Sequence, residues 1–316
     1  MSPRKRSAAK RARPKARPAS PAVPATGAPF PILRAALVQM KADGSPDRNL
    51  ARALDYVAAA AKRGARLVVL QELFRSQYFC FEENHDWFRL AETIPGPSTE
   101  ALGAVAKEHG VVIVAPLFER RAAGIYHNSA AVIDADGSVV DTYRKMHIPD
   151  DPGYFEKFYF SPGDLGFKAT RTAAGTLGTL ICWDQWFPEA ARLTAMAGAD
   201  LLLYPTAIGG IPKDSREDHA TQADAWETAQ RAHAIANGTF VLAVNRVGVE
   251  NGVRFWGGSF VCDPLGKVIA RAGRDRDELL VVDLDLRRVE YARQHWPFLR
   301  DRRIDAYIGI IRRWGE

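Results

Sequence analysis

Apolar and polar residues follow two different patterns along the chain, and these patterns distinguish predicted strands from predicted helices. Unbroken apolar runs of about four to eight residues are typical of buried strands, whereas apolar residues spaced three or four apart are typical of helices that bury one face. This pattern predicts strands over residues 32–40, 65–72, 111–119, 176–183, 199–206, 239–248 and 278–286. It predicts helices over residues 46–64, 98–110, 188–198 and 217–238.

Two further segments indicate hairpins. Residues 127–145 form two predicted strands around Asp136-Gly137, a dipeptide favoured in tight hairpin turns, and residues 257–273 do the same around the turn at 263–266. Alternating strands and helices with added hairpins indicate an α/β fold with mixed sheets, which we expect to form one domain over residues 32–290. We expect residues 291–316 to form a C-terminal extension that packs on a neighbouring subunit.

The net charge of +6 originates at the N-terminus. Residues 1–31 contain eight Lys and Arg and no acidic residue, so the remaining 285 residues have a net charge of −2. This Pro- and Ala-rich segment lacks a hydrophobic pattern and is expected to be disordered. Two interpretations stay open, a solvated extension and, less favoured, loose contact with nucleic acid. The segment lacks the apolar core of a secretory signal, and no apolar run approaches the ~20 residues of a membrane span, so we expect no membrane contact.

The cysteine content favours a reducing, cytoplasmic location. Cys80, Cys182 and Cys262 are odd in number and show no paired spacing, which argues against a disulfide framework. No His or Cys cluster has metal-ligand spacing, and neither a dinucleotide-binding nor a phosphate-binding glycine motif occurs. We therefore expect no metal and no cofactor.

Three predicted strand ends carry groups that could act together chemically: Glu72, Lys145 and Cys182. Ligands of open α/β sheets bind at the carboxyl ends of strands. There an ammonium can lower a thiol pKa and stabilise an oxyanion, and a carboxylate can accept the thiol proton and later activate water. Each residue also has a structural interpretation: a buried thiol is often only a small apolar side chain, Glu72 could cap a helix, and Lys145 could be a solvated strand end.

These segments resemble the nitrilase superfamily of carbon–nitrogen hydrolases. The similar stretches are LVVLQELF around Glu72, YRKMHIPDDPGYFEKFYFSPGD around Lys145 and LICWDQWFPEAARLTAMAGADLLLYPTAIG around Cys182. Within the superfamily, HIPDDPGYFEKFYF, CWDQWFPE and YPTAIG most resemble the N-carbamoylputrescine amidohydrolases of polyamine biosynthesis. The resemblance implies a four-layer αββα sandwich with Cys182 as the nucleophile, Lys145 at the oxyanion, Glu72 as the base and Glu156 positioning the substrate or Lys145. It also implies a homo-oligomer that acts on a small ureido or amide substrate.

The residues after Cys182 bear on the substrate. Relatives that cleave N-carbamoyl-D-amino acids resemble Cys-Asn-Asp-Arg-Arg there, with arginines that hold the substrate carboxylate, whereas this chain has Gln185 and Trp186. Without that basic fork, an uncharged or cationic tail is favoured. The carboxylates available for an ammonium are Asp150, Asp151, Glu156, Asp184 and Asp214. The residues expected to line the substrate pocket are Tyr78, Asn128, His147, Tyr154, Trp183, Asp184, Gln185, Thr206 and Trp256.

Three alternatives remain open at the level of sequence. The same mechanism could act on another substrate, as in β-ureidopropionases, ω-amidases or aliphatic amidases, and the segment 209–238, which resembles a second branch, bears on this point. A non-catalytic binding protein on the same fold is disfavoured, because Glu72, Lys145 and Cys182 are all present. A Cys–His hydrolase would use His147 or His233 as its base.

Overall fold

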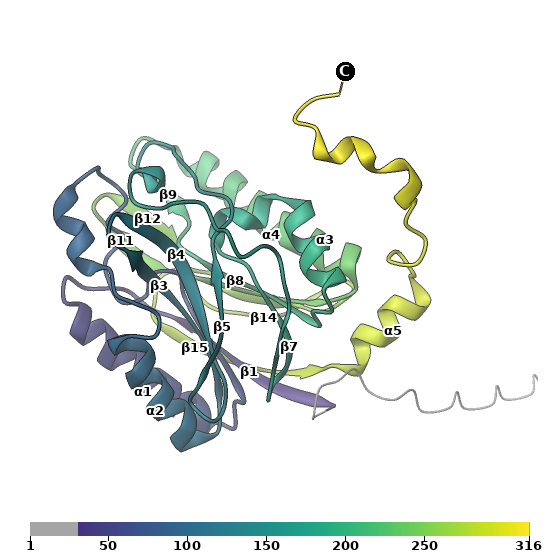
Figure 1. The fold of residues 1–316 in the computed structure, drawn as a ribbon, viewed down its shortest axis with the longest axis horizontal. Coiled ribbons are helices and arrows are strands. Elements are labelled where there is room, and N and C mark those ends of the chain that lie inside the picture. The colour runs from purple at the N-terminus through teal and green to yellow at the C-terminus, as the bar shows by residue number, and fades with distance from the viewer. Residues whose placement is uncertain (1–30, 316) are drawn as a thin grey trace, which may run out of the picture.

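The computed structural model describes residues 31–315, so the basic segment at 1–30 lies outside the described residues. The body contains two six-stranded mixed sheets (Figure 1). The first sheet has the order β15 (Glu278–Asp285), β1 (Ile32–Gln39), β2 (Leu67–Leu70), β3 (Val112–Ala122), β4 (Ile125–Ile133) and β5 (Val139–Arg144). The second has the order β14 (Val268–Arg271), β13 (Phe260–Cys262), β10 (Phe240–Asn245), β8 (Leu201–Thr206), β7 (Gly175–Thr179) and β6 (Thr170–Thr172).

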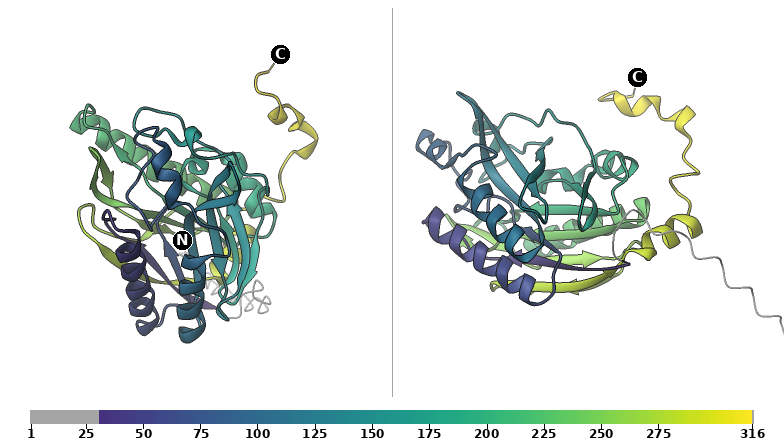
Figure 2. Two further views of the ribbon diagram at one scale, coloured as in Figure 1. Left: turned by 60° about the vertical axis from the view of Figure 1, so that its left-hand side comes forward. Right: turned by 60° about the horizontal axis from the view of Figure 1, so that its bottom comes forward.

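The two sheets lie between two pairs of helices. α1 (Pro46–Lys62) and α2 (Pro97–His109) cover the first sheet, and α3 (Pro188–Met196) and α4 (Arg216–Asn237) cover the second (Figures 1 and 2). The four-layer αββα sandwich expected from the sequence is therefore confirmed, with strands and helices close to the predicted segments.

The side chains of β1 show why the strands of both sheets have continuous apolar sequences. Leu33, Ala35 and Leu37 point into the core between the sheets, whereas Ala36 and Val38 pack under α1 and α2. Because successive strand residues face opposite sides, a strand buried on both faces needs apolar residues at every position. The inner face joins the two halves of the chain into one core.

A small third sheet borders the site described below. It contains β11 (Val247–Glu250), β12 (Val253–Trp256) and β9 (Gly209–Gly210) in antiparallel pairing. The sequence pattern predicted one strand over 239–248, which the structure divides into β10 and β11 between Asn245 and Val247. It predicted no strand at β12.

The C-terminal region differs from the predicted extension at its start. α5 (Arg287–His295) was not predicted and crosses the expected boundary at residue 290, with Val289 and Ala292 buried against the body. After α5 the chain leaves the body as an arm (Figures 1 and 2). The arm exposes large apolar side chains, among them Ile304, Ile308, Ile311 and Trp314, the last being 82% exposed. Among the described residues, no helix is both long and apolar enough to cross a bilayer.

Candidate active site

Cys182 lies on a strained turn between a strand and a helix. β7 ends at Thr179, α3 begins at Pro188, and a 3₁₀ turn over Cys182–Trp186 joins them. Cys182 has a φ of 42°, in the left-handed region that costs an L-residue about 1–2 kcal/mol. The distortion aims the side chain at a cavity instead of the core, although the residue is only 5% exposed. Strain kept at such a position points to a functional requirement.

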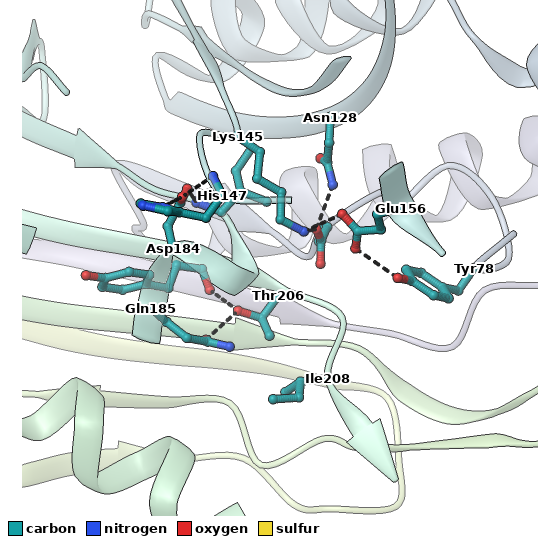
Figure 3. Close-up of polar contacts among 12 residues, drawn as sticks. Tyr78, Asn128, Lys145, His147, Glu156, Asp184, Gln185, Thr206 and Ile208 are labelled. Atoms are coloured by element: carbon teal, nitrogen blue, oxygen red, sulfur yellow. Dashed lines mark hydrogen bonds and ion pairs between the residues drawn. The ribbon is translucent and has the colours of Figure 1, made fainter. Parts of the chain in front are cut away.

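Asp184 holds this turn in place from behind. Its buried carboxylate accepts hydrogen bonds from the Ile181 backbone N–H at 2.9 Å and the Tyr143 hydroxyl at 2.7 Å. It also contacts Nδ1 of His147 at 2.7 Å (Figure 3). The His147 ring in turn stacks on Phe187. Tyr143 and His147 lie on either side of Lys145 in sequence. Asp184 therefore connects the Lys145 segment to the turn that carries Cys182. His147 and Asp184, which we expected to line the pocket, are both part of this supporting network, and neither is among the residues that line the cavity.

A buried cluster of charges surrounds Lys145. Its Nζ lies 2.9 Å from Oε1 of Glu72 and 2.6 Å from Oε2 of Glu156. Nδ2 of Asn128 donates to Glu72 Oε1 at 2.7 Å, and the Tyr78 hydroxyl donates to Glu156 Oε1 at 2.8 Å (Figure 3). All five residues are essentially inaccessible to water. Buried charges persist only when they are paired and hydrogen-bonded, as they are here.

The pKa values of the cluster follow from burial and mutual charge. Burial opposes the charge of Lys145, but Glu156 and Glu72 outweigh it and raise the pKa of Lys145 well above its usual value. Burial raises the pKa of Glu156 to about 7, with Lys145 opposing and Glu72 adding to the shift. Lys145 is therefore an ammonium at neutral pH, and Glu156 exchanges a proton near neutrality.

The Cys182 thiol differs from the sequence-based expectation. Burial raises its pKa well above the usual value, Glu72 raises it further, and Lys145 lowers it only in part. We expected the ammonium to dominate, but removal from water penalises the thiolate more strongly. Cys182 is thus a neutral thiol at rest and needs a base. The second carboxylate oxygen of Glu72, Oε2, has no hydrogen-bond partner among the described residues.

Neither histidine considered as a base lines the cavity that holds Cys182. His233 Nε2 contacts the Gln185 carbonyl oxygen at 2.8 Å, and His147 contacts Asp184. The charged groups that act on the Cys182 thiol are Glu72, Lys145 and Glu156. The Cys–His alternative has no support in this geometry.

Arg246 is a supporting residue that sequence reasoning missed. It is fully buried and donates to the carbonyl oxygens of Glu72 at 3.0 Å, Leu73 at 2.7 Å and Ser76 at 2.9 Å, and it pairs with Glu250 at 2.7 Å. It thereby fixes the segment after Glu72, where Leu73 has a φ of 48°. A lone arginine at the end of the apolar run 239–248 was the signal, because a charge at such a position must have buried partners.

The cavity above Cys182 has a volume of about 400 Å³, within the usual range of small-molecule sites. Of the predicted pocket residues, Tyr154, Trp183 and Trp256 line it, as do the candidate carboxylates Asp151 and Asp214. The other lining residues are Pro149, Pro152, Glu156, Cys182, Trp186, Ala207, Ile208, Gly209, Ile211, Lys213, Gln222 and Ala225. Asp150 is not among them, and Tyr78 and Asn128 act on the buried carboxylates instead.

Gln185 and Thr206 do not face the cavity, which corrects the sequence-based expectation. Gln185 is fully buried and its Oε1 accepts from Trp226 Nε1 at 2.7 Å and from the Thr206 hydroxyl at 3.3 Å (Figure 3). The positions of this turn after Cys182 that contact the cavity are Trp183 and Trp186. Over residues 31–315, no group of three or more His, Cys, Asp or Glu side chains is arranged to hold a metal ion.

Fold and site together define a class. A four-layer sandwich that presents a thiol beside a buried Glu–Lys–Glu cluster has the architecture of the nitrilase superfamily. The family model described as carbon-nitrogen hydrolase matches residues 34–294. The chain belongs to this family of enzymes, which act on carbon–nitrogen bonds.

Three relatives narrow the comparison. An N-carbamoylputrescine amidase from Solanum lycopersicum is 42% identical over 289 residues, covering 89% of this chain and 95% of that protein. A citrullinase from Francisella tularensis is 41% identical over 290 residues, covering 89% of this chain and 99% of that protein. A crystal structure of a carbon–nitrogen hydrolase from Helicobacter pylori superimposes with a TM-score of 0.87 and 47% identity, covering 90% of this chain and all of that one.

Proposed function

We propose that this protein is a thiol amidohydrolase that cleaves the ureido group of N-carbamoylputrescine to putrescine, carbon dioxide and ammonia, a step of polyamine biosynthesis. The observation that carries the proposal is the Glu72–Lys145–Glu156 cluster beside Cys182 at a cavity with no lining arginine among the described residues. The similarity to N-carbamoylputrescine amidases over most of the chain supports the choice of substrate.

The first half of the proposed reaction forms a covalent intermediate. Glu72 takes the proton of the neutral Cys182 thiol, and the sulfur attacks the ureido carbon. Lys145, held as an ammonium by two carboxylates, stabilises the oxyanion together with the backbone N–H of Trp183. The proton returns from Glu72 to the terminal nitrogen, ammonia leaves, and a carbamoyl thioester remains.

The second half releases the amine. Glu72 removes a proton from water, which attacks the thioester carbonyl, and the Cys182 thiol leaves with that proton. The resulting carbamic acid decomposes to carbon dioxide and the free amine. Glu156 keeps Lys145 aimed at the oxyanion through their 2.6 Å contact, and Tyr78 orients Glu156 in turn.

The cavity wall favours an uncharged or cationic tail. Trp183, Trp186 and Trp256 supply aromatic surfaces, and Asp151 and Asp214 supply carboxylates, which are the groups that hold an ammonium. Of the five carboxylates considered from sequence, these two remain, because Asp184 and Glu156 are engaged in buried contacts and Asp150 lies off the cavity.

Ammonia release with N-carbamoylputrescine, N-carbamoyl-β-alanine and an N-carbamoyl-D-amino acid tests the substrate. We expect a clear preference for the first compound. A preference for either carboxylated compound would leave the Cys–Lys–Glu mechanism in place and overturn the substrate.

Intact mass after substrate addition to Glu72→Gln tests the mechanism, with Glu108→Gln, an exposed carboxyl on α2, as the matched control. We expect loss of turnover in Glu72→Gln alone, without an adduct if Glu72 takes the thiol proton; a carbamoyl adduct on this variant would show that only the second half of the reaction needs Glu72. Full turnover by Glu72→Gln would contradict the role of Glu72.

Self-association and location are part of the proposal. We expect the arm after His295 to pack on a second copy of the chain, since it exposes Ile304, Ile308 and Trp314 to water. Truncation after His295 should lower the assembly mass measured by analytical ultracentrifugation, and an unchanged mass would contradict this role. The three cysteines are buried and unpaired, which supports a reducing, cytoplasmic location.

A further inference from the structure

Three charged side chains at the cavity form no ion pair within residues 31–315. Asp151, Lys213 and Asp214 all line the cavity that holds Cys182, and none forms an ion pair with another residue of the described chain. The only side-chain hydrogen bond among them runs from the Ile211 backbone N–H to Asp214 Oδ2 at 3.2 Å. Glu156, the remaining charged residue of the lining, is fully engaged by Lys145 and Tyr78.

Lys213 does not fit a purely cationic tail. N-carbamoylputrescine ends in one ammonium, for which Asp151 and Asp214 suffice, and an ammonium side chain next to Asp214 repels it. Lys213 and Asp214 are consecutive in the loop between β9 and α4 and line the same cavity. A cation and an anion side by side match a ligand that carries both charges on one carbon, as an α-amino acid does.

The surface beyond the cavity adds an independent observation. A second cavity of about 900 Å³ adjoins the first and shares Ile211, Asp214 and Trp256 with it. Its cationic lining residues are Lys41, Arg216, Arg254 and Arg274, and none of them forms an ion pair within residues 31–315, while Asp275 and Asp214 are its only lining carboxylates among those residues. This excess of positive charge beside the first cavity favours a ligand that carries a carboxylate in addition to its ammonium.

We infer that this enzyme also hydrolyses ureido α-amino acids with a tail as long as that of N-carbamoylputrescine, with Asp214 and Asp151 holding the α-ammonium and Lys213 the α-carboxylate. The inference rests on the proposed function, because the reaction at Cys182 is the same. The ureido group and one water give carbon dioxide, ammonia and the free diamino acid. L-Citrulline is the probe, since it equals N-carbamoylputrescine with one carboxylate added to the carbon that bears the ammonium.

The test compares kcat/KM for L-citrulline and N-carbamoylputrescine in wild type, Lys213→Met and Asp214→Asn. Lys213→Met keeps the aliphatic stem and removes the charge of an exposed residue, so folding is not at issue. We expect wild type to hydrolyse both compounds. In Lys213→Met the ratio of kcat/KM for L-citrulline to that for N-carbamoylputrescine should fall about tenfold or more, mainly through KM. Asp214→Asn should weaken both substrates, and Lys267→Met, an exposed lysine of the turn before β14, should keep the wild-type ratio.

Each other outcome decides the question. Hydrolysis of N-carbamoylputrescine without L-citrulline would overturn the inference and leave the proposed function standing. Hydrolysis of L-citrulline with a wild-type ratio in Lys213→Met would overturn the role of Lys213. If wild type hydrolyses neither compound, the proposed function and the inference fall together.

Discussion

The buried charges around Lys145 and the exposed charges at the cavity entrance obey opposite rules. Glu72, Lys145 and Glu156 are inaccessible to water and paired with one another at 2.9 Å or less. Lys213 and Asp214, at the entrance, form no ion pair within the described chain. In the interior a charge without a partner would unfold the protein, whereas at the entrance water takes the place of a partner until a ligand binds.

This difference teaches where chemistry and specificity reside. The interior cluster is tied to several elements: Glu72 follows β2, Lys145 follows β5, and Glu156 begins a 3₁₀ turn. A change there disturbs both reaction and fold. The entrance residues belong to one loop between β9 and α4, so a change there alters which tail binds without touching the reaction.

Replacing the nucleophile gives the largest expected effect. Cys182→Ala should lower kcat by about 10,000-fold or more, because no other group can form the thioester. Ammonia release and circular dichroism measure turnover and fold. Cys262→Ala, a buried thiol of β13 outside the cavity, serves as control and should remain active. Substantial turnover by Cys182→Ala would end the assignment.

Removing the charge of Lys145 tests whether the buried carboxylates need a partner. Lys145→Met leaves Glu72 and Glu156 buried without their partner and should lower the free energy of unfolding by about 3–5 kcal/mol. Arg34→Met is the matched control, because the Arg34–Asp283 pair is nearly half exposed on both sides and its loss should change the free energy of unfolding far less. Urea unfolding measures both. Equal losses would show that burial does not distinguish the two pairs.

The pH dependence of stability sharpens the comparison further. The pKa of Glu156 is about 7 in the folded protein, against an ordinary 4.5. Between pH 4.5 and pH 7 the folded state therefore binds more protons at this residue than the unfolded state does. The free energy of unfolding should therefore fall as pH rises from 4.5 to 7, by on the order of 2 kcal/mol from this residue. Glu156→Gln should remove that slope in urea unfolding, and Glu108→Gln on exposed α2 should keep it. A slope that survives in Glu156→Gln would assign the proton elsewhere.

The smallest effect is expected from removal of the basic N-terminal segment. Removing residues 1–28 should leave kcat/KM within about twofold of wild type, since β1 begins at Ile32 and every proposed site residue follows it. Assays at equal enzyme concentration measure this. A large loss on truncation would show that the segment takes part in catalysis or substrate binding.

Most elements were predictable because their burial leaves a periodic signal. The runs over 32–40 and 199–206 became β1 and β8, and the helix predicted over 217–238 became α4. β12 and α5 were not predicted. β12 alternates Arg254 with apolar residues at the rim of a cavity, and α5 buries only Val289 and Ala292, so neither displays a full periodic face.

The residues of the site also divide into those that the sequence predicts and those whose side-chain direction it does not predict. Glu72, Lys145 and Cys182 stand at strand ends, where the sequence pattern and the family resemblance predict them. The directions of Gln185 and Asp184 were not predictable, because the 3₁₀ turn that begins with a φ of 42° at Cys182 turns them into the core and leaves Trp186 at the cavity.

The sequence by itself therefore determined the class of fold, since apolar periodicity carries that information along the chain, and its resemblance to the family identified the three groups that we propose to react, and their order. Only the tertiary structure decided which charges are paired and which stay open. It showed that burial raises the pKa of the Cys182 thiol in spite of Lys145, and that Asp151, Lys213 and Asp214 share one cavity. The reason is physical: desolvation and the distance between charges depend on residues far apart in sequence, and only folding brings these together.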